Sequence, residues 1–360
     1  MMRFTNIGVA QFRNYLAEKF VFTERIVAIC GNNGTGKTNL LDAVYYLCFT
    51  KSYFSKPDAQ SVYQQLRGFR IEGEINSDNA VHEAVCILRE TNRKEFLLDE
   101  APYKKFSQHI GKFPCVFIAP DDVEIITGGS ELRRNFIDTI IAQADQAYLL
   151  HLIDYKKLLE ERNALLKAAA EKNYLDETLL NIIDTQLQKS GSNIFQYRHS
   201  FLGSFIPEVQ RAYQYIANSD DSLSIKYDSQ LINNSFGKLL EENRQRDLYL
   251  QRTSAGVHKD DLEIAMSGQP FKTMASQGQR KSLLFALKLA EFEILKQKKG
   301  FAPLLLLDDI FEKLDNQRMN NLLAKVCIEE NGQVFITDTH RDRLETALNN
   351  VGVAYQLIGL

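Results

Sequence analysis

The period of the hydrophobic pattern changes twice along the chain. Alternating apolar and polar residues predict antiparallel strands at 69–75 and 81–90, and continuous apolar runs predict buried strands at 22–30 and 113–120. Residues 131–202 contain one glycine and no proline, and their apolar side chains recur at helical spacing. The pattern therefore indicates strands at the beginning, followed by several amphipathic helices.

The last third returns to an alternation of strands and helices. We expect the following elements: a strand at 222–227 and a helix at 236–250, then strands at 261–266, 301–310 and 332–337 and a short strand at the end, with a long helix that follows residues 276–279 and helices at 317–329 and 341–349. Alternation of this kind favours an α/β fold. We predict a P-loop ATPase head of ABC type with a mixed sheet, formed by segments 1–125 and 251–360, and a mainly helical inserted domain at 126–250.

Composition sets limits on the function without choosing one. The 360 residues are 44% hydrophobic and 25% charged, with a net charge of −3. Such a chain is not uniformly basic, so a nucleic-acid site would have to be a local patch. The five cysteines, which form no CxxC pair, are expected to be buried free thiols in a cytoplasmic protein: Cys30, Cys48, Cys86, Cys115 and Cys327. No apolar run is long enough for a membrane span, and the first residues do not resemble a signal peptide.

Between the predicted strand 22–30 and the predicted helix 37–49, the chain reads GNNGTGKT. These residues match the phosphate-loop pattern in full and in the required context: Gly31, Asn32, Asn33, Gly34, Thr35, Gly36, Lys37 and Thr38. Backbone N–H groups of such a loop bind phosphate. Lys37 is expected to contact the β- and γ-phosphates, and Thr38 to bind Mg²⁺.

A second group of candidate residues follows the apolar run LLLLDD. A buried strand beside the phosphate-loop strand would end near the Mg²⁺. We therefore predict that Asp308 holds the metal and that Asp309 orients or deprotonates the attacking water. Asp315 follows in EKLD, and His340 ends the predicted strand in VFITDTH. A histidine in that position is as often a surface residue as a γ-phosphate contact.

The segment SQGQ, residues 276–279, precedes a long predicted helix. Taken alone, it is a helix cap. Followed by LLLLDD and EKLD, it resembles the signature, Walker B and D-loop series of ABC-type ATPases. That resemblance implies that Ser276 and Gly278 bind the γ-phosphate of ATP held by a second subunit, because a helix N-terminus attracts anions.

Over nearly its whole length the chain resembles the RecF family. The similar segments are FRNY, the phosphate loop, FIAPDDVEIITGGSELRRNFID, RTSAGVHKDDLEI, SQGQRKSLLFALKLAE and LLLLDDIFEKLD, all in the family's order. The resemblance implies an ATP-dependent homodimer with weak ATP hydrolysis. It also implies binding to gapped or junction DNA and work with RecR and RecO to load RecA in recombinational repair.

The chain departs from the family pattern at four places. Asp121 stands where glutamate is usual, Val257 replaces a proline, and TDTH replaces a threonine-rich segment that ends in aspartate. Asp309 is shorter than the glutamate of transporter ATPases, which predicts slow hydrolysis. Arg13 and Asn14 occupy positions that contact nucleotide in such heads, although they could equally pair within the sheet.

Small basic clusters are compatible with a DNA site but do not locate it: Lys104 and Lys105, Arg133 and Arg134, Lys156 and Lys157, and Arg244, Arg246 and Arg252. Three alternatives are disfavoured. An SMC-like or zinc-hook ATPase would carry long heptads or a CxxC hook. A transporter subunit would lack the helical insertion, and a small-molecule kinase would not need the signature helix.

Overall fold

The computed structural model describes residues 2–54, 57–77, 80–217, 222–312 and 316–360. It divides into two compact units. The head unit comprises Met1–Val123, Arg211–Ser219 and Ser276–Leu360, and the arm unit comprises Glu124–Gln210 and Asp220–Ala275. The expected α/β head with a helical insertion is confirmed, although the arm extends to Ala275 rather than to 250.

One sheet of the head unit is antiparallel, with the strand order β2-β1-β4-β5-β6-β7. Its strands are β1 (Arg3–Phe12), β2 (Tyr15–Val21), β4 (Phe69–Ser77), β5 (Ala80–Leu88), β6 (Lys94–Leu98) and β7 (Ala101–Pro102). Buried side chains alternate along β4 because one face of the sheet packs on the core. The antiparallel pairing predicted for residues 69–75 and 81–90 is confirmed.

The second sheet of the head unit is entirely parallel, with the order β14-β3-β13-β12-β8. Its strands are β3 (Ile26–Cys30), β8 (Cys115–Ile118), β12 (Leu304–Leu307), β13 (Val334–Asp338) and β14 (Gln356–Gly359). Apart from β14, every residue of these strands is buried, as expected for a sheet covered on both faces. All five strands therefore end at the same edge, where ligands bind in α/β proteins.

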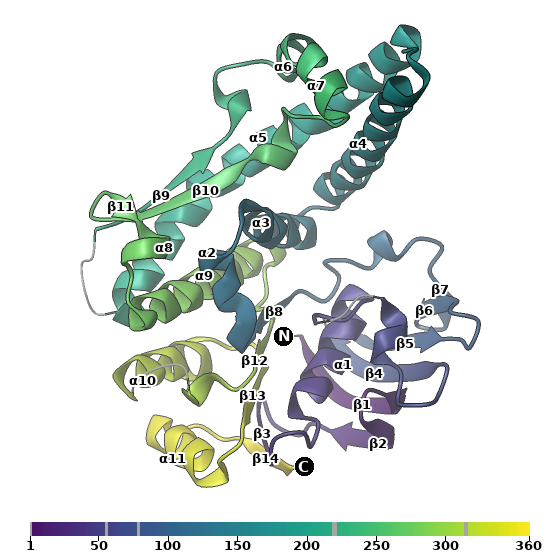
Figure 1. Cartoon of the computed structure of the whole chain (residues 1–360). Helices are drawn as coiled ribbons and strands as arrows, with labels where there is room; N and C mark the ends of the chain where they lie inside the picture. The colour runs from purple at the N-terminus through teal and green to yellow at the C-terminus, as the bar shows by residue number, and fades with distance from the viewer. Residues whose placement is uncertain (1, 55–56, 78–79, 218–221, 313–315) are drawn as a thin grey trace. The chain divides into compact units, whose positions relative to one another are not determined.

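Helices of the head unit cover this sheet. They are α1 (Lys37–Phe49), α9 (Gln277–Lys299), α10 (Asn316–Ala324) and α11 (Arg341–Val351), with a π-helical turn η7 (Lys325–Glu329) and short 3₁₀ turns η1 (Asp58–Ser61), η2 (Phe106–Gln108), η3 (Pro120–Val123) and η6 (Ile310–Glu312). Helix α1 contacts β4 and β5 on one side and β13 and β8 on the other (Figure 1). It is thus the layer between the two sheets.

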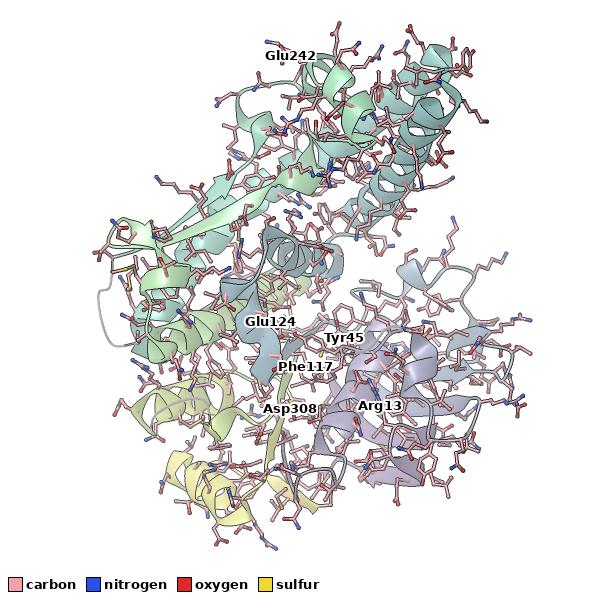
Figure 2. All side chains as sticks on the ribbon, in the orientation of Figure 1. Arg13, Tyr45, Phe117, Glu124, Glu242 and Asp308 are labelled. Atoms are coloured by element: carbon pink, nitrogen blue, oxygen red, sulfur yellow. The ribbon has the colours of Figure 1, made fainter. Side chains whose placement is uncertain are left out.

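Aromatic packing fixes α1 against the parallel sheet. The rings of Tyr45 and Phe117 are 5.8 Å apart and nearly perpendicular, and the two side chains face each other in Figure 2. Tyr53 stacks on Phe117 at 4.4 Å. Edge-to-face and offset-stacked rings add to the free energy gained by burying their area. The start of α1, which carries the phosphate loop, is therefore held in a defined position relative to the strand ends.

The arm unit contains long helices and a three-stranded sheet. Its elements are α2 (Glu124–Thr127), α3 (Ser130–Ala144), α4 (Gln146–Lys172), α5 (Glu177–Ala217, whose last turns belong to the head unit), β9 (Leu223–Asp228), η4 (Gln230–Ile232), α6 (Phe236–Glu242), α7 (Arg244–Leu250), η5 (Val257–Lys259), β10 (Asp261–Met266), β11 (Gln269–Pro270) and α8 (Phe271–Met274). Strand β10 pairs with β9 from Asp261 to Met266, and this pairing keeps residues 251–275 in the arm unit.

Two buried arginines organise the arm unit. Arg162 is fully buried and donates to Asp184 and Asp247, each at 2.6 Å. Arg198 donates to Asp138 at 3.1 Å and to Asp260 at 2.9 Å. Removing one partner from such a buried pair would leave an uncompensated charge. These four aspartates therefore accept hydrogen bonds from arginines in the interior of the arm unit.

Two predicted helices differ in detail. The helix expected at 236–250 is two helices, because Asn243 leaves the helical conformation and its side-chain amide caps the carbonyl of Leu239 at 2.8 Å. The helix expected at 317–329 ends in a π-helical turn, where the N–H of Glu330 bonds to the carbonyl of Lys325. All five cysteines are buried free thiols, as predicted. Within the described ranges, no helix is both long and apolar enough to cross a bilayer.

Candidate nucleotide-binding site

The loop between β3 and α1 has the geometry that its glycines predict. Gly34 has φ of 84° and Gly36 has φ of 117°, values that other residues rarely adopt. A Cβ on Gly36 would lie 2.7 Å from the Tyr15 hydroxyl oxygen. Gly36 is the N-cap of α1 and offers no side chain to the first-turn N–H groups. These donors at a positive helix end form a site for an anion.

Lys37 places its charge inside this loop. Its ammonium donates to the carbonyl oxygens of Gly31 at 2.7 Å and of Asn32 at 3.0 Å, and the side chain is buried. Asn32 and Asn33 are exposed, while Thr35 is partly buried and its hydroxyl donates to the carbonyl of Asn32. The loop thus combines backbone donors with one cation, as the binding of polyphosphate requires.

The end of β12 meets the start of α1. The hydroxyl of Thr38 lies 2.8 and 3.0 Å from the two carboxylate oxygens of Asp308. Thr337, at the end of β13, donates to Asp308 at 2.8 Å and accepts from the N–H of Asp309 at 2.9 Å. Burial raises the pKa of Asp308, and the hydrogen bonds from Thr337 and Thr38 act in the opposite direction. The prediction from sequence did not include Thr337, although its place at a neighbouring strand end could have suggested it.

The FRNY segment braces the phosphate loop. Asn14 donates to the carbonyl of Thr35 at 2.9 Å, and the Tyr15 hydroxyl donates to the carbonyl of Gly36 at 3.0 Å. Arg13 instead forms an ion pair with the buried carboxylate of Asp42 at 2.9 Å, inside the head unit (Figure 2). Tyr15 was not predicted as a site residue, and its membership of the FRNY segment was the only signal for it.

The end of β13 carries the last candidates of the head unit. His340 is exposed and is the N-cap residue of α11, and its N–H bonds to the buried carboxylate of Asp338 at 3.1 Å. Arg343 donates to the same carboxylate at 2.7 Å. His340 therefore follows the strand between β3 and β12, at the edge that carries the phosphate loop. Asp315 lies outside the described residues.

The signature segment begins helix α9 with a complete capping box. The Ser276 hydroxyl accepts from the N–H of Gln279 at 3.2 Å, and the Gln279 side chain accepts from the N–H of Ser276 at 2.9 Å. Ser276 is exposed. A Cβ at Gly278 would lie 2.6 Å from a guanidinium nitrogen of Arg318. The helix-cap interpretation is thus confirmed, and it leaves this helix N-terminus at the surface, where a second subunit could reach it.

The middle of α9 holds a buried charged cluster that was not predicted from the sequence. Lys288 lies 3.4 Å from Asp122 and 3.7 Å from Glu291, and all three side chains are almost fully buried. Burial raises the pKa of Glu291 to about 7, with Lys288 opposing the shift. Tyr53 donates to Asp122. The cluster therefore joins the signature helix to η3 and to the segment after α1.

The donor set at the strand ends fits a magnesium ion. A hydroxyl and a carboxylate already face each other there, and Mg²⁺ prefers a few such oxygens together with water and phosphate oxygens. Among the described residues there is no cluster of three or more His, Cys, Asp or Glu side chains arranged for a metal.

Comparisons with known proteins agree with this geometry. The family described as RecF/RecN/SMC N terminal domain matches residues 3–358. The DNA replication and repair protein RecF of Flavobacterium johnsoniae is 40% identical over 359 residues, which cover 100% of both chains. The chain belongs to the RecF family. This family lies within the SMC-like class of ABC-type ATPases, as predicted from the motifs.

Relatives and solved structures support the assignment along the whole chain. RecF of Phocaeicola vulgatus is 39% identical, with 98% of this chain and 95% of the relative covered. The structure of the recombination mediator protein RecF with ATP in the RecFOR pathway is 30% identical, with a TM-score of 0.88 and 94% and 92% of the two chains covered. An Smc head from Pyrococcus furiosus, 16% identical with a TM-score of 0.57 and coverage of 100% and 93%, shares the fold.

Proposed function

We propose that this RecF-family chain is an ATP-dependent DNA-binding protein of recombinational repair and replication restart, and that ATP joins two copies of it. The observation that carries the proposal is the contact between Thr38 and Asp308 beside the phosphate loop. It brings the two halves of an ABC-type nucleotide site together within one head unit. The name and the ATP-bound structure of the relatives support the same conclusion.

In the proposed mechanism, the loop residues Gly31 to Thr38 bind the phosphates of ATP. Lys37 moves from the carbonyls of Gly31 and Asn32 to phosphate oxygens, which are stronger acceptors because they are charged. Thr38 and Asp308 would hold Mg²⁺, which neutralises phosphate charge when bound. Asn14 and Tyr15 keep the loop in its binding conformation through bonds to Thr35 and Gly36. Arg13 acts through its ion pair with Asp42 on α1.

Asp309 is the proposed base that orients or deprotonates water. Its N–H is fixed by Thr337, and its own φ of 50° turns it away from the direction of β12. Aspartate has a shorter reach than glutamate, so we propose that hydrolysis is slow and times release rather than driving a motor. His340 is proposed to sense or position the γ-phosphate from the same edge of the sheet. Asp315, which lies outside the described residues, is proposed as a further catalytic residue on the family resemblance alone.

Ser276 and Gly278 are proposed to act on the nucleotide of a second copy. The N-terminus of α9 is exposed. Its capping box engages the N–H groups of Ser276 and Gln279, so the partial positive charge and the N–H groups between these two are what it can offer to a phosphate. ATP bound between two copies stabilises the dimer by mass action, and hydrolysis removes that stabilisation.

The proposed DNA is gapped duplex with junctions of single and double strands, and the proposed partners are RecR, RecO and RecA. Support comes from the names of the relatives, which describe DNA replication, repair and the RecFOR pathway. The test is binding of the chain to a gapped duplex with and without Mg–ATP across a salt series. The proposal predicts tighter binding with Mg–ATP and an affinity that falls steeply with salt. If the chain bound no DNA with or without Mg–ATP, the DNA role would be wrong, while the proposal that the head binds and hydrolyses ATP would stand.

A further inference from the structure

The arm unit has a highly exposed aromatic ring on α7, three residues after one of four cations: Lys259 and the three arginines whose charges act on it. We define the arm patch as Arg134, Arg246, Tyr249, Arg252 and Lys259. Tyr249 on α7 is 87% exposed. Arg246 precedes it by three residues on the same helix, so the two side chains are neighbours on one face. An exposed aromatic ring beside cations is a recurrent arrangement for stacking an unpaired base.

Three carboxylates near the arm patch accept from other arginines, while Glu131, on α3 with Arg134, acts on Arg134 through its charge. Asp247 accepts from Arg162 at 2.6 Å, and Asp260 accepts from Arg198 at 2.9 Å. Asp261 pairs with Arg133 at 2.6 Å. In the part of the chain that the structure describes, no ion pair joins a carboxylate to Arg134, Arg246, Arg252 or Lys259. Their charge is therefore available to an external anion.

The backbone brings these cations together on fixed supports. Arg134 donates to the carbonyl of Asp260 at 2.6 Å, next to Lys259. Thr253, which follows Arg252, accepts from Arg162 at 3.0 Å and donates to Asn163. Burial and then the like charges of Arg252 and Arg134 lower the pKa of Lys259, Asp247 opposes the shift, and Arg246 adds a smaller lowering effect. An anion that binds among these cations relieves the repulsion of their like charges.

The helix before α7 does not neutralise the patch. Glu242, labelled at the end of α6 in Figure 2, lies one turn before Arg246 and pairs with Lys238 at 3.6 Å. Buried Asp247 anchors α7 on its inner side, where it accepts from the N–H of Ser254 at 2.9 Å. Arg246 and Tyr249 are thus held on the outer side of an immobilised helix.

We infer that the arm patch binds the single-stranded segment of a DNA junction, with phosphates on Arg134, Arg246, Arg252 and Lys259 and an unpaired base stacked on Tyr249. This inference rests on the proposed DNA role and adds the surface and the kind of strand. A duplex would contact the cations but would offer no open base to the ring. An acidic protein segment, the other class of anionic partner, would contact the cations without stacking a base on Tyr249.

The experiment compares full-length variants with Mg–ATP by anisotropy of labelled oligothymidylate and of a blunt duplex. Tyr249→Ala is expected to weaken oligothymidylate binding about five- to a hundredfold and to leave duplex binding unchanged. Arg246→Ala and Arg252→Ala are each expected to reduce the salt slope for the single strand by about 0.7. The matched controls are Tyr174→Ala, an exposed tyrosine at 71%, and Lys189→Ala, an exposed lysine of α5 in the arm unit.

Each outcome decides a separate point. If the patch variants bind oligothymidylate as the controls do, the arm patch is wrong while the DNA role stands. If Tyr249→Ala weakens duplex and single strand equally, the single-strand assignment is wrong. If polyglutamate competes as well as oligothymidylate, an acidic protein is the better occupant. If the wild-type chain binds no DNA, the inference and the DNA role both fall.

Discussion

The hydroxyl of Thr38 lies 2.8 Å from a carboxylate oxygen of Asp308, although 270 residues separate them in the sequence. The contact forms because β3 and β12 are strands of one parallel sheet whose ends share an edge. Everything proposed about the nucleotide site depends on this meeting of the loop and the carboxylate.

Lys37→Ala tests the phosphate loop. The variant lacks the ammonium of Lys37. In the wild-type structure this group donates to the carbonyls of Gly31 and Asn32, and it is the one ammonium of the loop Gly31–Thr38. Because a charged hydrogen bond contributes about 1.5–3 kcal/mol, we expect ATP affinity to fall roughly ten- to a hundredfold. Fluorescence titration with labelled ATP measures this, and Lys19→Ala on exposed β2 serves as the control. Equal affinities of the two variants would show that the loop does not bind the phosphates.

Thr337→Val tests whether the Thr337 hydroxyl holds Asp308 and Asp309 in position. Its hydroxyl bonds to both Asp308 and the N–H of Asp309, and the residue is fully buried. We expect the free energy of unfolding in urea to fall by about 1–3 kcal/mol, and the Mg²⁺ concentration needed for ATP binding to rise. Thr339→Val is the control, since its hydroxyl makes only a 3.4 Å contact to Asp338. If Thr337→Val required the same Mg²⁺ concentration for ATP binding as wild type, Thr337 would have no role in positioning Asp308 and Asp309.

Glu291→Gln tests the buried cluster through its dependence on pH. The pKa of Glu291 in the folded chain, about 7, exceeds the ordinary glutamate value of 4.5, so between these two pH values the folded chain retains a proton that the unfolded chain loses. This group therefore lowers the free energy of unfolding as pH rises through that window. Glutamine does not titrate, so its free energy of unfolding does not fall in this way. As pH rises from acid to neutral, the free energy of unfolding of the variant should therefore increase by up to about 3 kcal/mol relative to that of wild type.

Urea unfolding of the wild type and the Glu291→Gln variant at several pH values measures this difference, with Glu18→Gln on the exposed strand β2 as the control. Parallel pH profiles for wild type and Glu291→Gln would show that Glu291 does not titrate within the cluster. Since Lys288 retains Asp122 as a partner in the variant, loss of the whole fold is not expected.

Local patterns explain why much of the site could be predicted. The phosphate loop is continuous in sequence, and the helix expected at 37–49 begins and ends at the predicted residues. The buried run before Asp308 is a strand because both faces of its sheet are covered. The role of Thr337 depends on the register in which Leu307 faces Ile336, and no pattern within either strand reveals that register.

Tertiary contacts explain what the sequence did not reveal. The helical period of α9 predicts an apolar buried face, yet Lys288 and Glu291 lie on it. Asp122 and Tyr53, from distant segments, contact Lys288, and Lys288 lies 3.7 Å from Glu291. The arm unit continues to Ala275 because β10 pairs with β9, a contact that composition does not signal. The arm patch likewise brings α3 together with α7 and η5, which follow much later in the chain.

The most direct test of the central claim is the mass of the chain in solution, by light scattering, with and without Mg–ATP. Ser276→Arg places a bulky cation at the exposed start of α9 and leaves the phosphate loop of the same chain intact. The account predicts that wild type doubles its mass with Mg–ATP, while Ser276→Arg binds ATP with wild-type affinity and stays monomeric. A Ser276→Arg variant that doubles its mass as wild type does would contradict the role of the signature helix in trans.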